Sequence, residues 1–208
     1  DATLAVEQMK SRLEGSLHPV VAVDLEGSLG GSRAFRRHIA LLQICVDGVN
    51  DEPQLIYVFD THSTRAILSA SGDLSLRSLL ERDDIAKVFH CCHGDVSSLY
   101  EEYGIVTRHV FDTAVADSLL NRVHFNTNRS LQRVLTDRLG EDVVKLSQKG
   151  ALVHEVGMFE PRPLAAHLFL YAYEDVIYLV RAYFQMRDLL GRLGFQELWR
   201  ALSQLRCP

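Results

Sequence analysis

Acidic side chains stand at the ends of short apolar runs in this sequence. The run VVAV leads directly into Asp24 and Glu26, and AKVF leads into HCCHGD, which ends at Asp95. Successive side chains of an extended strand alternate between its two faces, so Asp24 and Glu26 point the same way. Because two carboxylates after a buried run are costly without a cation, this pattern favours a fold that gathers strand ends around a metal.

A tyrosine and an aspartate near residue 170 supply a second pair. Tyr171 and Asp175 in YAYEDV are four residues apart in a stretch that reads as helical on both sides, so they share one helix face. Asp95 opens the run VSSLYEEY, where a strand gives way to a helix. These residues can therefore converge, and a convergent cluster of acids is a site for hard divalent cations, which prefer oxygen ligands.

The order and spacing of these residues resemble the DEDD superfamily of 3′-to-5′ exonucleases, in the tyrosine-containing branch (DEDDy) to which ribonuclease D belongs. The family motifs are D-x-E at a strand end, an Asp five residues after a His, and Y-x-x-x-D on a helix. Here they read Asp24 to Glu26, His90 to Asp95, and Tyr171 to Asp175. The resemblance covers residues 18–190, and FHCCHGDVSSLY is most similar to the Egalitarian-type exonuclease domain.

The sequence also departs from the family pattern. Its first motif is DLEG where many relatives have a Thr-containing turn, and Phe159 stands before R-P-L where the family often has Trp. We expect the second change to alter packing more than chemistry.

The resemblance implies a catalytic set and two Mg2+ or Mn2+ ions as cofactors. Two such ions about 3.5–4 Å apart can activate water and stabilise an in-line displacement at phosphorus. The implied metal ligands are Asp24, Glu26, Asp95 and Asp175, with Asp24 bridging the ions and Asp95 acting through water. Tyr171 would orient the attacking water and help to remove its proton.

Extended runs and helical patterns predict an α/β fold. Strands are predicted near residues 20–24, 38–46, 55–60, 86–90 and 108–112. Helices are predicted near residues 1–15, 65–80, 95–103, 113–121, 130–139, 163–192 and 194–205. Three consecutive strands followed by alternating strands and helices indicate a mixed sheet. The resemblance implies the ribonuclease H-like arrangement, a mixed β-sheet flanked by helices.

Composition fits one ordinary globular domain. The chain has 208 residues, 47% of them hydrophobic and 24% charged, which is enough for one substantial core. Apolar runs such as HIALLQICV are well short of a membrane span, so no membrane association is expected. We expect a single exonuclease domain over 1–208, with its core at 18–190. Because the chain begins at Asp1 without Met, we expect a fragment of a longer protein.

Cysteine spacing favours an intracellular, reducing compartment. No C-x-x-C pair occurs among the four cysteines, which are Cys45, Cys91, Cys92 and Cys207. The run from His90 to His93 also admits a zinc site, although adjacent strand residues alternate faces and cannot easily supply four tetrahedral ligands. The alternative is a strand end with core cysteines and histidines that line a cleft.

Two aspartates admit a purely structural interpretation. Asp95 could be only an N-cap of the following helix, although capping and outer-sphere metal binding are compatible. Asp112, which is followed by Thr113 at a strand-to-helix junction, is expected to be a cap rather than a ligand. Glu174 is expected on a neighbouring helical face, outside the acidic cluster.

Local clusters of basic residues indicate where a nucleic acid could bind. The net charge of −5 argues against broad coating of a duplex. Basic residues nevertheless gather beside the first motif and before the third, and such clusters can hold the phosphates of a single strand. A solvated charged surface is the structural alternative. The candidate nucleic-acid-binding residues are Arg33, Arg36, Arg37, His90, Arg122 and Arg129.

These patterns predict a metal-dependent 3′-to-5′ exonuclease that acts on single-stranded nucleic acid and releases nucleoside 5′-monophosphates. RNA processing is favoured over DNA because the family members that the chain resembles process RNA. The alternative is a catalytically silent scaffold that uses the same cleft to bind RNA or a protein partner. Proofreading of DNA is disfavoured because the chain contains no polymerase segment.

Overall fold

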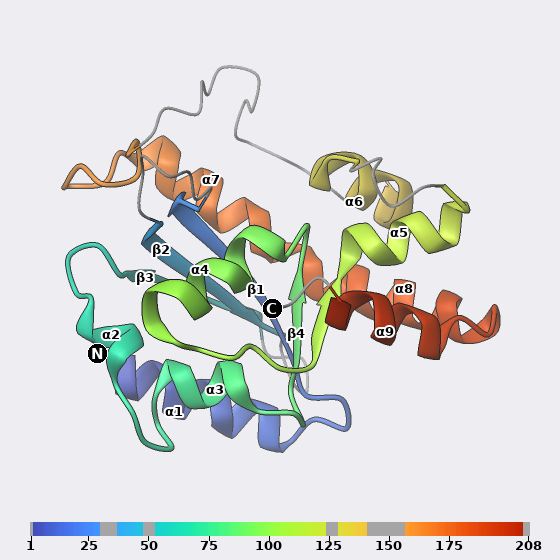
Figure 1. Ribbon diagram of the computed structural model, residues 1–208, viewed down its shortest axis with the longest axis horizontal. Coiled ribbons are helices and arrows are strands. Elements are labelled where there is room, and N and C mark those ends of the chain that lie inside the picture. Colours follow the sequence, from blue (N-terminus) through green and yellow to red (C-terminus); the bar gives the residue numbers. More distant parts are fainter. Residues whose placement is uncertain (1, 30–36, 48–52, 124–128, 141–156, 206–208) are drawn as a thin grey trace.

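A five-stranded mixed sheet forms the centre of the molecule (Figure 1). The computed structural model describes residues 2–29, 37–47, 53–123, 129–140 and 157–205. The strand order is β3-β2-β1-β4-β5. β1 pairs antiparallel with β2 and parallel with β4; β2–β3 is antiparallel and β4–β5 parallel. The strands are β1 Val20–Ser28, β2 His38–Val46, β3 Leu55–Asp60, β4 Ala86–Phe89 and β5 Val110–Asp112.

Helices cover both faces of this sheet, as the sequence predicts. One face packs on α1 Ala2–Glu14, α2 Ala66–Ser69, α3 Leu76–Glu81 and α4 His93–Tyr103. The other face packs on α5 Thr113–Asn121, α6 Leu131–Leu139, α7 Ala166–Ile177, α8 Leu179–Arg192 and α9 Gln196–Leu205. In the part of the chain that the structure describes, no helix is long and apolar enough to cross a membrane.

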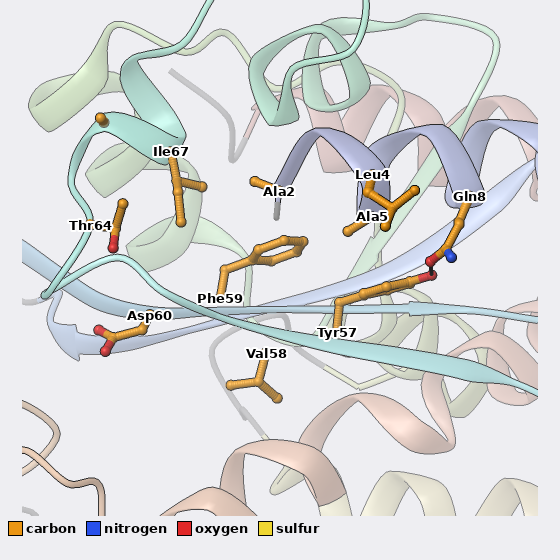
Figure 2. Close-up of a pocket in the computed structure, with 11 residues that line it drawn as sticks. Ala2, Leu4, Ala5, Gln8, Tyr57, Val58, Phe59, Asp60, Thr64 and Ile67 are labelled. Atoms are coloured by element: carbon orange, nitrogen blue, oxygen red, sulfur yellow. Dashed lines mark hydrogen bonds between the residues drawn. The ribbon is translucent and has the colours of Figure 1, made fainter.

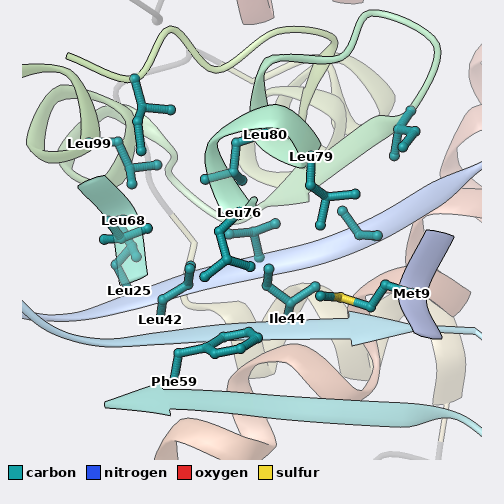
Figure 3. Packing of buried hydrophobic residues seen from close by; sticks show 14 of the residues in the cluster. Met9, Leu25, Leu42, Ile44, Phe59, Leu68, Leu76, Leu79, Leu80 and Leu99 are labelled. Atoms are coloured by element: carbon teal, nitrogen blue, oxygen red, sulfur yellow. The ribbon is translucent and has the colours of Figure 1, made fainter. Parts of the chain in front are cut away.

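Side chains alternate between the two faces of the sheet along each strand, and this alternation divides the hydrophobic core into two layers. Leu25, Leu42 and Ile44 point into the layer formed with α1, α3 and α4, where Figure 3 shows them packed around Met9 and Phe59. Residues of the opposite parity face α5 to α9 instead, as Val20, Ala22 and Cys45 do. Asp24 and Glu26 continue that second set, so β1 carries them to the face covered by α7.

The edge strand β3 shows the same alternation at a hollow of about 770 Å³ (Figure 2). Tyr57 and Phe59 point toward α1, and the Tyr57 hydroxyl donates to Gln8 Oε1 at 2.9 Å. Val58 points the other way, toward the second layer, where it packs beside Leu41 and Tyr171. The hollow and the acidic residues therefore lie on opposite faces of the sheet.

Three elements differ most clearly from those expected. β1 extends beyond residue 24 to Ser28, because its pairing with β2 continues past the acids. The single helix expected at 65–80 is instead two short helices, α2 and α3, separated by a loop in which Gly72 has φ 106°. The side chain of Ser75 caps the start of α3. The helix expected at 163–192 is interrupted at Tyr178 (φ −100°, ψ −10°), where no glycine or proline marks the break.

Candidate active site

The end of β1 positions the first two acids. Asp24 lies opposite Gln43 of β2, and the register shifts between Glu26 and Gly27 in a β-bulge. Gly27 has φ 147°, and a Cβ there would lie 2.2 Å from the His38 carbonyl oxygen and 2.8 Å from the Ala40 nitrogen. Only glycine fits this close approach, so the residue after Glu26 is fixed by the bulge.

Helix α7 positions the tyrosine and the third acid. Tyr171 and Asp175 are one turn apart, and both are buried, at 7% and 5% exposure. The Tyr171 ring packs against Phe159, with ring centroids 6.2 Å apart. Arg162 fastens the segment before α7 to the end of β3, because its Nε donates to Asp60 Oδ2 at 2.7 Å and its Nη2 to Oδ1 at 2.5 Å. This ion pair holds the pKa of Asp60 well below its usual range.

Three of the expected ligands meet at one point. Asp24, Glu26 and Asp175 each offer a carboxylate oxygen, and these oxygens lie within 4.8 Å of one another. Like charges at that separation repel, and a divalent cation removes the repulsion. The donors are all hard oxygens and two side chains are partly exposed, so the set fits Mg2+ or Mn2+ with water completing the coordination.

Asp95 lies beside this group in the first turn of α4. Its carboxylate accepts a hydrogen bond from the backbone N–H of Leu25, the residue between Asp24 and Glu26. Burial, together with the nearby charge of Asp112, raises the pKa of Asp95 to about 7. Cys92, not Asp95, occupies the N-cap of α4, so the capping interpretation of Asp95 is wrong.

The Tyr171 hydroxyl faces the same acids. Burial and the charges of Asp175, Glu26 and Asp24 raise the pKa of the Tyr171 phenol far above its usual range. The phenol and the Asp175 carboxylate are hydrogen-bonded. Tyr171 therefore keeps its proton and acts as a neutral hydrogen-bonding group at the edge of the cluster.

Asp112 is the expected cap, with an additional role. Its side chain accepts from the backbone N–H of Ala114 at 2.8 Å, which caps α5. It also accepts from the N–H groups of Cys91 at 3.0 Å and Cys92 at 3.2 Å. Cys91 has φ 61°, so this carboxylate stabilises a strained turn that leads from β4 into α4. Asp112 thereby helps to place Asp95.

Three candidate nucleic-acid-binding residues have partners inside the protein. Arg37 Nε pairs with Glu101 at 2.8 Å. The His90 ring lies between two partners: its Nδ1 is 2.9 Å from the Thr113 hydroxyl oxygen, and its Nε2 is 2.9 Å from the Arg129 carbonyl oxygen. Arg129 pairs with Asp137 and, at 3.1 Å, with the buried Asp117.

The other three candidate nucleic-acid-binding residues are Arg33, Arg36 and Arg122. Arg122 is exposed at the end of α5, with φ 55°. Arg33 and Arg36 lie outside the described residues.

Two further expectations concern the cluster's membership. Glu174 is buried but does not belong to the three-carboxylate group, in line with its expected place on a neighbouring helical face. Within the described ranges, the only group of three or more potential metal ligands is that of the three carboxylates, so the residues from His90 to His93 form no zinc site there.

Gln43 was not among the expected site residues. It is fully buried next to Asp24, although it stands inside the apolar run HIALLQICV. A polar residue in the middle of a buried strand is the signal that could have identified it.

Comparison with known proteins places the chain in a family. A family model described as 3′-5′ exonuclease matches residues 3–191. The chain belongs to the 3′-5′ exonuclease family. A ribonuclease D of Acidiphilium cryptum is 26% identical to this exonuclease chain over 200 residues, which are 93% of the chain and 43% of the relative. An Egalitarian protein homolog of Caenorhabditis elegans is 34% identical over 89 residues, which are 43% of the chain and 15% of the relative. The exonuclease chain thus spans less than half the length of these curated relatives.

Solved structures share the fold. Escherichia coli RNase D superposes with a TM-score of 0.72 at 16% identity, covering 99% of this chain and 47% of that one. Brucella melitensis NrnC with bound Mg2+ gives 0.66 at 22% identity, covering 94% and 85%. A Trypanosoma brucei RNase D complex with RNA U12 gives 0.65 at 22%, covering 89% and 60%. The expected ribonuclease H-like arrangement of the chain is confirmed.

Proposed function

We propose that this chain, as one domain over residues 1–208, is a metal-dependent 3′-to-5′ exoribonuclease of the tyrosine-containing branch. It shortens single-stranded RNA and releases nucleoside 5′-monophosphates, with two Mg2+ or Mn2+ ions as cofactors. The observation that carries the proposal is the group formed by Asp24, Glu26 and Asp175, with carboxylate oxygens within 4.8 Å of one another beside Tyr171. Membership in the 3′-5′ exonuclease family supports it.

The four acids have different roles in metal binding. Asp24, Glu26 and Asp175 would hold one ion, Asp24 would also serve the other, and Asp95 would act on the second site through water. Ions bound there would supply a water of lowered pKa and stabilise the attacking and leaving oxygens at phosphorus. Asp95 is suited to an indirect role because it lies outside the group of three carboxylates whose oxygens meet.

Tyr171 orients the attacking water. Beside a metal that lowers the pKa of that water, Tyr171 would also help to remove the water's proton. Its bond with the Asp175 carboxylate fixes the direction of the hydroxyl, and its packing on Phe159 fixes the ring. The site therefore holds a preorganised dipole next to the acids.

RNA is the favoured substrate because relatives of this chain carry ribonuclease D names and one structural neighbour is a complex with RNA U12. DNA is the second substrate to test, and a protein partner is suggested by the match to exosome complex component 10 of Mus musculus. We also propose an intracellular, reducing compartment. In the part of the chain that the structure describes, Cys45, Cys91 and Cys92 form no disulfide, which fits that assignment.

The decisive experiment is a nuclease assay on the purified protein. Single-stranded RNA and DNA with a 5′ label are incubated with Mg2+, Mn2+ or a chelator. We expect stepwise shortening of RNA that requires the metal, and loss of activity in Asp24→Ala with the fold intact. Removing one of several mutually repelling acids should not destabilise the metal-free protein. Glu7→Ala, which removes an exposed acid on α1, is the matched control and should keep full activity.

Two outcomes would contradict the proposal. Undiminished turnover in Asp24→Ala would exclude the metal role of the acids. A protein that binds RNA but releases no nucleotide with either metal would be the silent scaffold instead.

A further inference from the structure

Gln43 is a buried polar residue next to the acids whose amide is left unpaired. Its side chain on β2 is fully buried, at 0% exposure, and neither Oε1 nor Nε2 has a hydrogen-bond partner among the described residues. It lies directly opposite Asp24 in the β1–β2 register.

The fold places the Gln43 amide on the same side of the sheet as the acids. Paired residues of antiparallel strands share a face, so Gln43 and Asp24 point the same way, with Cβ atoms about 4.5–5.5 Å apart. The neighbours of Gln43 along β2, Leu42 and Ile44, point into the opposite layer in Figure 3. Val58, which pairs with Gln43 from β3, points away from α1 in Figure 2.

Packing gives no reason for an amide at this position. Apart from Asp24 on β1, its strand neighbours on the same face are apolar, since Leu41 and Cys45 flank it along β2 and Val58 lies opposite on β3. Burying an unpaired amide lowers the stability of the folded protein, whereas burying a methionine or leucine of similar volume would raise it. The amide is therefore a feature of the site and not of the core.

We infer that Gln43 is a positioning residue for Asp24. When a divalent cation binds at Asp24, the Gln43 side chain turns so that its Nε2–H donates to the Asp24 carboxylate, a bond that the described geometry lacks, and this bond fixes the orientation in which the carboxylate holds the cation. The cross-strand separation is within reach of a glutamine side chain after rotation about its torsions. Carboxylates that bind metals are commonly held by such outer hydrogen bonds. The inference rests on the proposed function, because it assigns Gln43 to the same metal site.

Replacement of the amide by a thioether tests the inference. In Gln43→Met we expect Mn2+ affinity, measured by calorimetric titration of the metal-free protein, to fall about 10–100-fold. Turnover on single-stranded RNA should fall with it at saturating substrate, while KM stays close to the wild-type value. The melting temperature of the metal-free protein should stay equal or rise, because an unpaired buried amide has been removed. Gln43→Leu provides a second variant if the methionine protein does not fold.

Val58→Ala is the matched control, since it alters the same face one strand further from Asp24. It should lower the melting temperature and leave Mn2+ affinity unchanged. If both Gln43 variants bind Mn2+ as tightly as wild type does, the inference fails. A lower melting temperature with unchanged Mn2+ affinity, as expected for the control, would show that Gln43 is a structural residue. If wild type itself neither binds Mn2+ nor shortens RNA, the proposed function fails, and with it any role for Gln43 at the metal.

Discussion

At the scale of single residues, the site contains two buried aspartates, Asp95 and Asp112, whose surroundings differ. Asp112 accepts three backbone N–H bonds, which hold the turn that leads from β4 into α4 and cap α5. Asp95 is nearly as buried and is raised in pKa by that burial and by Asp112 itself. Two neighbouring aspartates therefore have different roles, since one stabilises a turn and the other remains available to the metal site.

This difference predicts a pH-dependent effect of Asp95→Asn. The folded pKa of Asp95, about 7, lies above the ordinary value of 3.8, so the folded state retains a proton that the unfolded state releases. Wild-type stability therefore falls as pH rises between those values, and the full penalty persists above pH 7. The neutral asparagine avoids it, and its side-chain oxygen can still accept from Leu25. Urea unfolding in chelator should show a gain in stability for Asp95→Asn that grows between pH 5 and pH 8.5. A gain that is constant with pH would contradict the assignment.

At the scale of elements, specific contacts hold the end of β1 and the segment before α7. The bulge at Gly27 sets the direction of Glu26, and the Arg162–Asp60 ion pair ties the segment before α7 to β3. β1 and α7 are distant in sequence, so their relative position depends on these contacts together with the sheet register. The geometry of the acids follows from that position.

Gly27→Ala should therefore damage the site through the backbone. The added Cβ would collide with backbone atoms of His38 and Ala40, which cannot move aside as a flexible side chain can. We expect a loss of about 1–3 kcal/mol in unfolding free energy and weaker Mn2+ binding, because Glu26 is displaced. Gly72→Ala is the control. Gly72 also has positive φ, at 106°, but a Cβ there meets nothing within 4 Å, so this variant should lose some stability and keep its metal affinity. Equal metal affinity in both variants would show that the bulge does not position Glu26.

At the scale of the whole molecule, charge limits how a nucleic acid can be held. The chain carries a net charge of −5, and Arg37 and Arg129 are engaged in ion pairs within the protein. If the proposed function holds, we expect a strand to be held mainly at its metal-bound end, with Arg37 and Arg129 contributing little to phosphate binding. An exonuclease held in this way recognises an end and not a length of backbone.

Linear and circular single strands of the same RNA sequence test this expectation. The linear strand should be shortened stepwise from its 3′ end, and the circular strand should resist. A blunt duplex should also resist, because opening it costs about 1.4 kcal/mol per base-pair step. The affinity of the linear strand should depend weakly on salt, since each phosphate contact contributes about 0.7 to the slope. Internal cleavage of the circle would contradict end recognition.

Local sequence was sufficient for several features. The alternation of a strand put Asp24 and Glu26 on one face, and helical periodicity put Tyr171 and Asp175 on another. The cap at Asp112 and the mixed sheet were also predictable, because each depends on residues close in sequence or on the order of strands and helices. These patterns, with their spacing, were enough to indicate the exonuclease family.

Only the tertiary structure decided which of these residues meet. The approach of Asp175 to Asp24 and Glu26 within 4.8 Å depends on packing between α7 and the sheet, which no local pattern encodes. The same holds for His90 and Arg129, which read as nucleic-acid ligands in sequence but have partners inside the protein. Gln43 shows the reason most clearly. Its burial and its position opposite Asp24 come from strand register, and register is fixed by long-range pairing between the two strands.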